Sequence, residues 1–379
     1  MTDTLTICVF TGSRAEFGLL RCVMDAISAQ SGARLQVVAG GSHMLEPTRT
    51  IDEIREAYSV DDAVPMQQDG HGTRADDALA LGRGIDGCAI AFRRLAPDCV
   101  VVLGDRIEAL AAASAASIMG VPVAHIHGGD VAEGVADDSI RHAITKLSHI
   151  HLAATEQSAE RITRLGENPW RVHVVGSPSI DELRSAGTHE YEPSLEIGEP
   201  SAALLWHPVG RNNEAEQRDA TRVLDALRTE RVLVFEPNHD AGRAGVLDAL
   251  DASERTHLHR VSHLPRAEFL YWMRRLASGD GVLVGNSSSA LIEAAGVGLP
   301  AVDIGPRQAG RERGTNVIHV DEPDPKSVQD AICRARAIDR SAITHPFGDG
   351  HAGERIADVL VDSLRTRSRE EFVRKRIAY

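Results

Sequence analysis

Short apolar runs that alternate with helical stretches are the feature that most limits how this chain folds. The runs TLTICVFT (4–11), LQVVAGG (35–41), DCVVVLG (98–104) and PVAHIH (122–127) are rich in residues that favour strands, and helical stretches follow at 15–30 and 107–120. Strands that are apolar along nearly their whole length are typical of a parallel sheet covered on both faces. The first half of the chain is therefore predicted to be a doubly wound α/β domain.

The same pattern starts again after an irregular segment at 187–201, which is rich in Pro, Gly and Glu and is typical of a linker. Apolar runs follow at 201–208, 231–238, 258–265, 281–286 and 300–305. We predict Rossmann-like domains at 1–183 and 200–360, followed by a helix or tail at 361–379. Ligands of such sheets bind at the carboxyl ends of the strands, so we expect the two domains to face each other across a cleft.

Composition excludes several classes of partner. The 379 residues are 42% hydrophobic, which is enough for two cores, and the net charge of −14 argues against nucleic acid or an anionic membrane. The five cysteines show neither metal-ligand spacing nor a disulfide framework. No leader is evident, and no window approaches the roughly 18 apolar residues of a membrane span. We expect a soluble, cytoplasmic protein.

Charged residues follow the first and third of the predicted strands in the first domain. Gly12, Ser13 and Arg14 come at the start of a helix, where free N–H groups and an arginine suit a phosphate. Asp105 and Arg106 follow the run at 98–104, where a carboxylate is placed for acid or base chemistry. A plain turn at Arg14 and a simple helix cap at Asp105 are the alternatives.

The segment HIHGGD (125–130) adds a second polar strand end. His125 and His127 are two positions apart in a strand and therefore share one face, and Asp130 follows two glycines. A His-x-His pair can bind a metal, but the remaining ligands would have to come from elsewhere. The next predicted helix, DDSIRHAITKLSH (137–149), carries Asp137 and Asp138 in its first turn.

The second half contains the sharpest signal for a nucleotide. His207 and Asn238 lie at predicted strand ends, and GNSSS (285–289) follows a buried strand and opens a helix of small residues. Backbone donors and hydroxyl groups there can hold a diphosphate, and Glu293 is placed to accept from a ribose diol. No GxSxG elbow surrounds the serines, which argues against a serine hydrolase.

Taken together, these motifs closely resemble the hydrolysing UDP-N-acetylglucosamine 2-epimerase family. The resemblance spans about residues 7 to 320 and rests on GSRAEFG, GDRIEAL, HIHGGD, DDSIRHAITKLSH, VGSPSID, HPV, PNHDAG, GNSSSALIE and RQAGRERGTNV. It implies the two-domain GT-B fold and the release of UDP and N-acetylmannosamine, as in sialic-acid synthesis. Close relatives act on bacillosamine-type nucleotide sugars.

The resemblance also assigns residues. Asp105 and Asp137 correspond to catalytic carboxylates, and His263 lies in the segment that contacts the nucleobase. The nucleotide-binding positions would be Arg14, Arg106, His207, Asn238, Ser287, Ser288, Glu293 and Arg311. Many relatives have glutamate where this chain has His127 or Asp130. The shorter Asp130 would shift a base by about 1 Å, which can reduce the rate about 100-fold, and His127 can act as a proton relay instead.

We therefore expect a nucleotide-sugar 2-epimerase that uses neither a metal nor another cofactor. Its proposed catalytic set is Asp105, His127, Asp130 and Asp137, and its partner is the nucleotide sugar. A GT-B glycosyltransferase and a nucleotide-sugar binder without turnover are the alternatives. The family resemblance further implies a homodimer.

Overall fold

The protein consists of two compact α/β units. A computed structural model describes residues 4–46, 49–68, 73–131, 137–185, 191–195, 197–237, 242–253, 256–262 and 264–378. Unit 1 comprises Met1–Asp130, Ala136–Glu182 and Phe347–Tyr379, and unit 2 comprises Val131–Val135 and Leu183–Pro346. Among the helices in this part of the chain, none combines the length and apolar content that crossing a bilayer requires.

Over the described residues, unit 1 holds a seven-stranded parallel sheet in the order β3-β2-β1-β4-β5-β6-β7. Its strands are β1 (Leu5–Thr11), β2 (Ala33–Gly40), β3 (Asp62–Val64), β4 (Cys99–Leu103), β5 (Val123–Ile126), β6 (Ile150–Ala153) and β7 (Val172–Val174). The strand order reverses between β1 and β4, where ligands of doubly wound sheets bind. The predicted α/β fold is confirmed.

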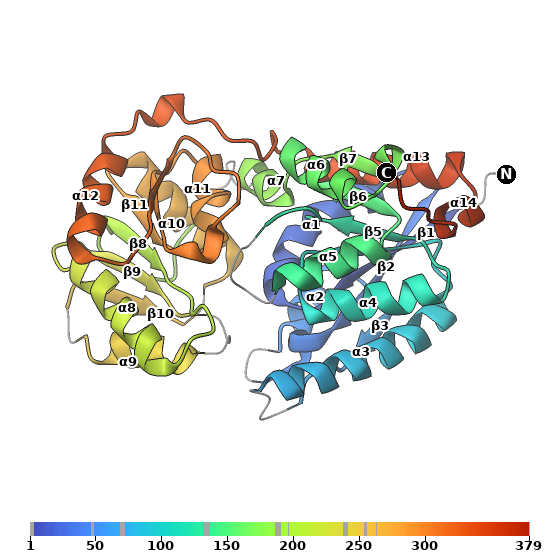
Figure 1. Cartoon of the computed structure of the whole chain (residues 1–379), viewed down its shortest axis with the longest axis horizontal. Coiled ribbons are helices and arrows are strands. Elements are labelled where there is room, and N and C mark those ends of the chain that lie inside the picture. Colours follow the sequence, from blue (N-terminus) through green and yellow to red (C-terminus); the bar gives the residue numbers. More distant parts are fainter. Residues whose placement is uncertain are drawn as a thin grey trace. The chain divides into compact units, whose positions relative to one another are not determined.

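Helices cover both faces of this sheet, as the apolar strands require. They are α1 (Arg14–Ala29), α2 (Ile51–Ala57), α3 (Arg74–Leu95), α4 (Ile107–Ile118), α5 (Asp137–Leu147), α6 (Glu156–Arg164), α13 (Ala352–Thr366) and α14 (Arg369–Val373), and α7 (Pro178–Ser185) begins in unit 1. Ile7 and Val9 of β1 pack in the core that includes α1 and α13, whereas Cys8 and Phe10 pack against α3 and α4. Figure 1 shows α3, α4 and α5 side by side on their face.

Unit 2 repeats this design with a six-stranded parallel sheet in the order β10-β9-β8-β11-β12-β13 over the described residues. Its strands are β8 (Ala202–Leu205), β9 (Val232–Phe235), β10 (Leu258–Val261), β11 (Val282–Gly285), β12 (Ala301–Ile304) and β13 (Val317–Val320). Its helices are α8 (Asn213–Ala226), α9 (Arg243–Asp251), α10 (Arg266–Ser278), α11 (Glu293–Gly296) and α12 (Pro325–Arg336). The strand order reverses between β8 and β11, so the corresponding binding edge lies there.

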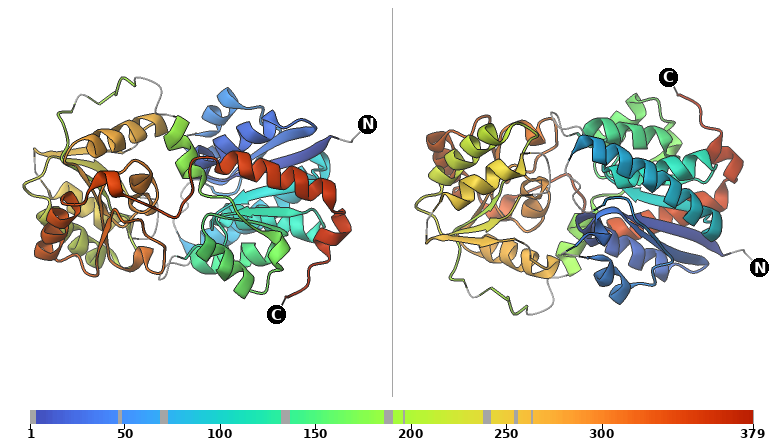
Figure 2. Two further views of the ribbon diagram at one scale, coloured as in Figure 1. Left: turned by 90° about the horizontal axis from the view of Figure 1, so that it is seen from above. Right: turned by 90° about the horizontal axis from the view of Figure 1, so that it is seen from below.

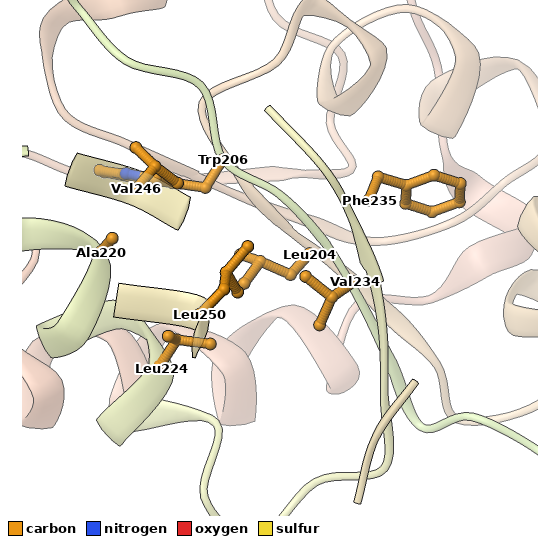
Figure 3. A pocket seen from close by; sticks show the side chains of 8 residues that line it. All are labelled: Leu204, Trp206, Ala220, Leu224, Val234, Phe235, Val246 and Leu250. Atoms are coloured by element: carbon orange, nitrogen blue, oxygen red, sulfur yellow. The ribbon is translucent and has the colours of Figure 1, made fainter. Parts of the chain in front are cut away.

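A small cavity in unit 2 belongs to the core. Figure 3 shows that it is lined by apolar and aromatic side chains from β8, β9, α8 and α9, among them Leu204, Trp206, Val234 and Leu250. All four side chains are buried. Because the lining offers no charged group, the cavity is a packing feature and not a candidate site for an anionic ligand.

The C-terminal segment departs from the predicted domain boundaries. The predicted second domain extends to residue 360, but residues 347–379 belong to unit 1. Helix α13 crosses the predicted boundary, and its buried Ile356 and Leu360 join the core that contains α1. Figure 2 shows α13 beside α1. The reason is long-range packing, which local sequence patterns do not reveal.

Lys375, near the C-terminus, binds the C-terminal end of α5. Lys375 Nζ donates to the carbonyl oxygens of Thr145, Lys146 and Ser148 at 3.2, 2.8 and 2.6 Å, and it lies 2.7 Å from Glu167 Oε2. Cations are favourable at a helix C-terminus, where carbonyl groups lack helical partners. The terminal segment therefore fixes the helix whose first turn carries Asp137.

We predict that Lys375→Met lowers the free energy of unfolding by about 1 to 3 kcal/mol, because Glu167 and three carbonyl groups lose a partner. The matched control is Arg374→Met, since Arg374 is 75% exposed and pairs with an exposed Glu370. That change should stay within about 0.5 kcal/mol. Urea titrations of both variants measure the difference, and equal stabilities would contradict the role of Lys375.

Candidate functional site

Arg14 lies at the carboxyl end of β1, as predicted from the sequence. Ser13 is the N-cap of α1, and its hydroxyl accepts from the N–H of Glu16 at 3.5 Å. The Arg14 guanidinium lies 3.2 Å from Glu53 on α2, with 26% of its side chain exposed. Arg14 is thus partly exposed at this sheet edge, and in the described structure its guanidinium is paired with Glu53.

Two buried carboxylates, Glu16 and Glu108, lie next to Gly12 at the end of β1. A Cβ atom on Gly12 would lie 2.2 Å from Cβ of Glu108 and 3.4 Å from Glu16 Oε2, so only glycine lets the helices approach this closely. Glu16 accepts from the N–H of Gly12 at 2.8 Å, and Glu108 accepts from Gln67 at 2.7 Å and Arg106 at 3.3 Å. Burial, together with the nearby Glu108, raises the pKa of Glu16 to about 8.

Asp105 follows β4 and pairs with a buried arginine of α5. Arg141 Nη2 donates to Asp105 Oδ2, and Arg141 Nη1 lies 3.8 Å from Asp130 Oδ2. The Arg141 side chain is 1% exposed, whereas that of Asp105 is 25% exposed. A buried guanidinium requires carboxylate partners, and Arg141 finds them in the segments that follow β4 and β5, where Asp105 is the more accessible carboxylate.

His127 and Asp130 form a hydrogen-bonded pair after β5. His127 Nδ1 lies 2.8 Å from Asp130 Oδ2, and His127 Nε2 lies 3.0 Å from the hydroxyl of Ser177. The backbone of His127 has φ 62°, a left-handed conformation that is uncommon for a residue with a side chain. Gly129 has φ 76°, and a Cβ there would lie 2.2 Å from the carbonyl oxygen of Ser158. The HIHGGD segment is therefore held in one strained geometry.

His125 has different hydrogen-bond partners from His127. Its Nε2 donates to the carbonyl oxygen of Gly104 at 2.7 Å, and its Nδ1 lies 3.2 Å from the Thr145 hydroxyl. Burial lowers the pKa of His125 to about 3, so its ring is neutral. In the described parts of the chain, no group of three or more His, Cys, Asp or Glu side chains is arranged to hold a metal ion. The two histidines thus have separate protein partners.

In unit 2, Asn286 joins the ends of β8 and β11. Its side-chain amide accepts from the backbone N–H of His207 and donates to the carbonyl oxygen of His207, both at 2.8 Å. This pair fixes the backbone of His207 at the sheet edge. Burial and the nearby Arg307 lower the pKa of His207 to about 3. The ring is therefore neutral, so it can offer a ligand a hydrogen bond but no positive charge.

The GNSSS segment forms a turn instead of the long helix predicted from its small residues. Ser287 caps a single 3-10 turn, η4 (Ser288–Ala290), and the four-residue α11 follows. Gly285 ends β11 with φ 147°, and a Cβ there would lie 2.0 Å from the carbonyl oxygen of Leu205, so the close packing of β8 and β11 requires glycine before the turn. Support for a diphosphate site therefore comes from the serine hydroxyls and turn N–H groups, and not from a helix dipole.

Glu293 and Arg311 lie in the same unit. Arg266 Nη2 donates to Glu293 Oε1 at 3.2 Å, and Arg311 donates to the carbonyl oxygen of Val131 at 2.7 Å and to Gln308 at 3.0 Å. Both predicted nucleotide-binding residues are thus held by protein groups.

Three predicted site residues lie outside what the structure describes: Asn238, His263 and the side chain of Asp137. The remaining predicted residues fall into two groups. Unit 1 gathers Arg14, Asp105, Arg106, His127 and Asp130 at one sheet edge, and unit 2 gathers His207, Ser287, Ser288, Glu293 and Arg311.

The residues that sequence reasoning missed are the buried partners. Arg141, Ser177, Glu16 and Glu108 carry no predicted role, because their importance depends on contacts between distant segments. A charged residue inside an apolar helical pattern is the available signal, and Arg141 in DDSIRHAITKL meets it. The motif VGSPSID, which contains Ser177, gives no signal beyond the family resemblance.

Two α/β units with parallel sheets, each with polar side chains at its switch point, define a two-domain fold of the GT-B type. The chain belongs to the UDP-N-acetylglucosamine 2-epimerase family, whose model matches residues 25–361. The expected family and fold are thereby confirmed.

Individual relatives agree with this assignment. The chain is 33% identical to the UDP-N,N'-diacetylbacillosamine 2-epimerase (hydrolyzing) of Legionella pneumophila, over 92% of this chain and 94% of the relative. It is 32% identical to the UDP-N-acetylglucosamine 2-epimerase of Neisseria meningitidis, over 93% and 94%. The UDP-GlcNAc 2-epimerase of Methanocaldococcus jannaschii, solved with UDP-GlcNAc and UDP, has the same fold with a TM-score of 0.78, 17% identity and coverage of 94% and 100%.

The buried pair of Glu16 and Glu108 generates a prediction about pH. The folded chain keeps a proton on Glu16 up to about pH 8, whereas the usual pKa of 4.5 makes the unfolded chain lose it much earlier. Between these values the folded state binds more protons, so the free energy of unfolding falls as pH rises. Glu16→Gln removes this loss, and from pH 5 to pH 9 the variant should gain about 1 to 3 kcal/mol relative to wild type.

Denaturant titrations across that pH range measure the effect. Glu56→Gln, at an exposed position on α2, is the matched control and should follow the wild-type pH dependence. Parallel curves for wild type and Glu16→Gln would show that Glu16 is already ionised in the folded protein at pH 5.

Proposed function

We propose that this protein is a hydrolysing 2-epimerase of UDP-N-acetylglucosamine or a related 2-acetamido nucleotide sugar. Its products would be UDP and an N-acetylmannosamine-type sugar. The observation that carries the proposal is the cluster of Asp105, Arg141, Asp130 and His127 at the switch-point edge of unit 1, in a chain of the UDP-N-acetylglucosamine 2-epimerase family.

The chemistry requires proton transfer on two faces of one sugar ring. A base removes the proton at C2 while the C1–O bond to the diphosphate breaks, which leaves a 2-acetamidoglucal. Water then adds at C1, and a proton returns to C2 from the opposite face. Asp105 and Asp137 are proposed as the two carboxylates, with His127 and Asp130 beside them, because positioned carboxylates and imidazoles are effective acids and bases near neutral pH.

The leaving diphosphate develops negative charge, which positioned donors can stabilise. Arg14 and Arg106 in unit 1, and Arg311, Ser287 and Ser288 in unit 2, are the proposed donors. His207 would contribute a hydrogen bond, and Glu293 is proposed to accept from the ribose. Asn238 and His263 complete the proposed nucleotide-binding set by resemblance alone. None of these roles requires a metal or a redox cofactor.

The biological setting follows from the same proposal. Names of the relatives include UDP-GlcNAc and UDP-N,N'-diacetylbacillosamine 2-epimerases, so a free 2-acetamido sugar for sialic-acid-type synthesis is the proposed product. We further propose a homodimer that acts in the cytoplasm, where nucleotide sugars are made.

The test is incubation with UDP-, GDP- and CDP-linked 2-acetamido sugars without an acceptor. We expect release of the nucleoside diphosphate together with a free sugar inverted at C2. Sugar transfer that requires an added acceptor would indicate a glycosyltransferase, and tight binding without release would indicate a binder.

Asp105→Asn tests the central carboxylate. It should lower kcat by roughly 100-fold or more while UDP affinity stays unchanged, because the amide keeps the size but cannot accept the proton. Asp25→Asn, on the exposed side of α1, is the matched control. A near-normal kcat for Asp105→Asn would remove Asp105 from the mechanism.

A further inference from the structure

A buried glutamate of α8 holds the loop that follows β8 in unit 2. The loop has the sequence HPVGR (207–211) and begins with His207, which is proposed to bind the diphosphate. Oε1 of Glu216 accepts from the backbone N–H groups of Val209 at 2.9 Å and Arg211 at 3.0 Å. One carboxylate oxygen therefore receives two N–H groups of the same short loop.

The sequence of the HPVGR loop favours this contact. Pro208 has no N–H and a restricted φ, whereas Gly210 has φ 82°, a left-handed conformation. A Cβ atom on Gly210 would meet no atom within 4 Å, so the backbone conformation, and not a lack of space, favours glycine there. N–H groups around a left-handed residue can converge on one anionic oxygen. In this loop, Glu216 supplies that oxygen from within the protein.

The surroundings of Glu216 are also fixed. Its side chain has no exposed surface, and a Cβ atom on Gly242, before α9, would lie only 2.8 Å from Glu216 Cγ and 3.3 Å from Pro208 Cβ. Burial of a carboxylate costs free energy unless hydrogen bonds compensate. An acidic residue that only favoured the N-terminus of α8 would serve as well at the exposed Glu214. The burial of Glu216 is therefore explained by its contacts with the loop.

The same loop has a second fixed point at His207. Asn286 binds the N–H and the carbonyl oxygen of His207, both at 2.8 Å, and Glu216 binds the loop two and four residues further along the chain. A side chain that must contact a ligand in one orientation needs a fixed backbone, because a displacement of about 1 Å can cost about 100-fold in rate.

We propose that Glu216 is a positioning residue for nucleotide binding, which holds the HPVGR loop so that His207 contacts the diphosphate in one orientation. The inference rests on the proposed function, in which His207 contributes a hydrogen bond to the diphosphate. Glu216 itself does not contact the ligand, because its side chain is fully buried. The position of its acceptor oxygen, and not its negative charge, is what the loop requires.

Two substitutions separate position from charge. Glu216→Gln keeps an acceptor oxygen at the same reach and removes the charge, whereas Glu216→Asp keeps the charge and withdraws the acceptor by one methylene group. Amide hydrogen exchange, followed by NMR without ligand, should show Val209 and Arg211 protected in wild type and in Glu216→Gln. In Glu216→Asp both amides should exchange about 10-fold faster. Unchanged protection in Glu216→Asp would overturn the inference.

UDP calorimetry on the same proteins supplies the functional readout. Glu216→Asp should bind UDP about 10-fold more weakly than wild type, and Glu216→Gln should stay within about 2-fold. In a His207→Ala background, Glu216→Asp should cause no further loss, because both residues act through one contact. Glu214→Gln, in the same turn of α8, is the matched control and should leave UDP affinity unchanged.

Two results of the calorimetry would contradict the positioning role. One is a pair of losses that multiply when Glu216→Asp and His207→Ala are combined, since Glu216 would then act on UDP by another route. The other is weakened binding by Glu216→Gln with normal binding by Glu216→Asp, which would assign the effect to charge. Absence of UDP binding by the wild type would overturn the proposed function instead, while amide exchange would still test the hold of Glu216 on the loop.

Discussion

The buried guanidinium of Arg141 is the contact on which the candidate site of unit 1 depends. It lies within α5, is 1% exposed, and reaches Asp105 after β4 and Asp130 after β5. A cation in such surroundings is stable only with carboxylate partners, so the ends of two strands and one helix are tied together. Asp130 in turn contacts the ring of His127, whose other nitrogen lies near the Ser177 hydroxyl and whose backbone is left-handed. Arg141 thus contacts two carboxylates directly and the His127 ring through Asp130.

Unit 2 achieves a comparable result with a neutral group. Asn286 bonds to both backbone groups of His207, and its own carbonyl oxygen accepts from Gln308 at 3.0 Å and Arg307 at 3.2 Å. The ends of β8 and β11 and the segment after β12 are therefore joined at one residue. A preorganised turn of this kind can offer backbone N–H groups to a diphosphate without further rearrangement. The two units share a topology but stabilise their binding edges by different chemistry.

Sequence patterns predicted the strands around both switch points, since these are apolar along their length. Short strands that contain polar residues, such as β3 (Asp62–Val64) and β13 (Val317–Val320), gave no comparable signal. The return of residues 347–379 to unit 1 depends on contacts of Ile356 and Leu360 with the core around α1, which no local pattern encodes. Polar residues at the ends of these apolar strands can be predicted from the sequence, because the strands themselves can. The roles of Arg141 and Ser177 cannot, because they depend on contacts between segments that are distant in the sequence.

Proton exchange at C2 is the measurement that tests the central claim most directly. In deuterated water, a 2-epimerase that abstracts the C2 proton and returns a solvent-derived one should place one deuterium at C2 of the released sugar, as seen by NMR and mass spectrometry. The label would follow because the proton taken up by Asp105, the proposed base, would exchange with solvent before the opposite face is protonated. A released sugar with hydrogen retained at C2 would contradict proton abstraction there and, with it, the role assigned to the cluster around Arg141.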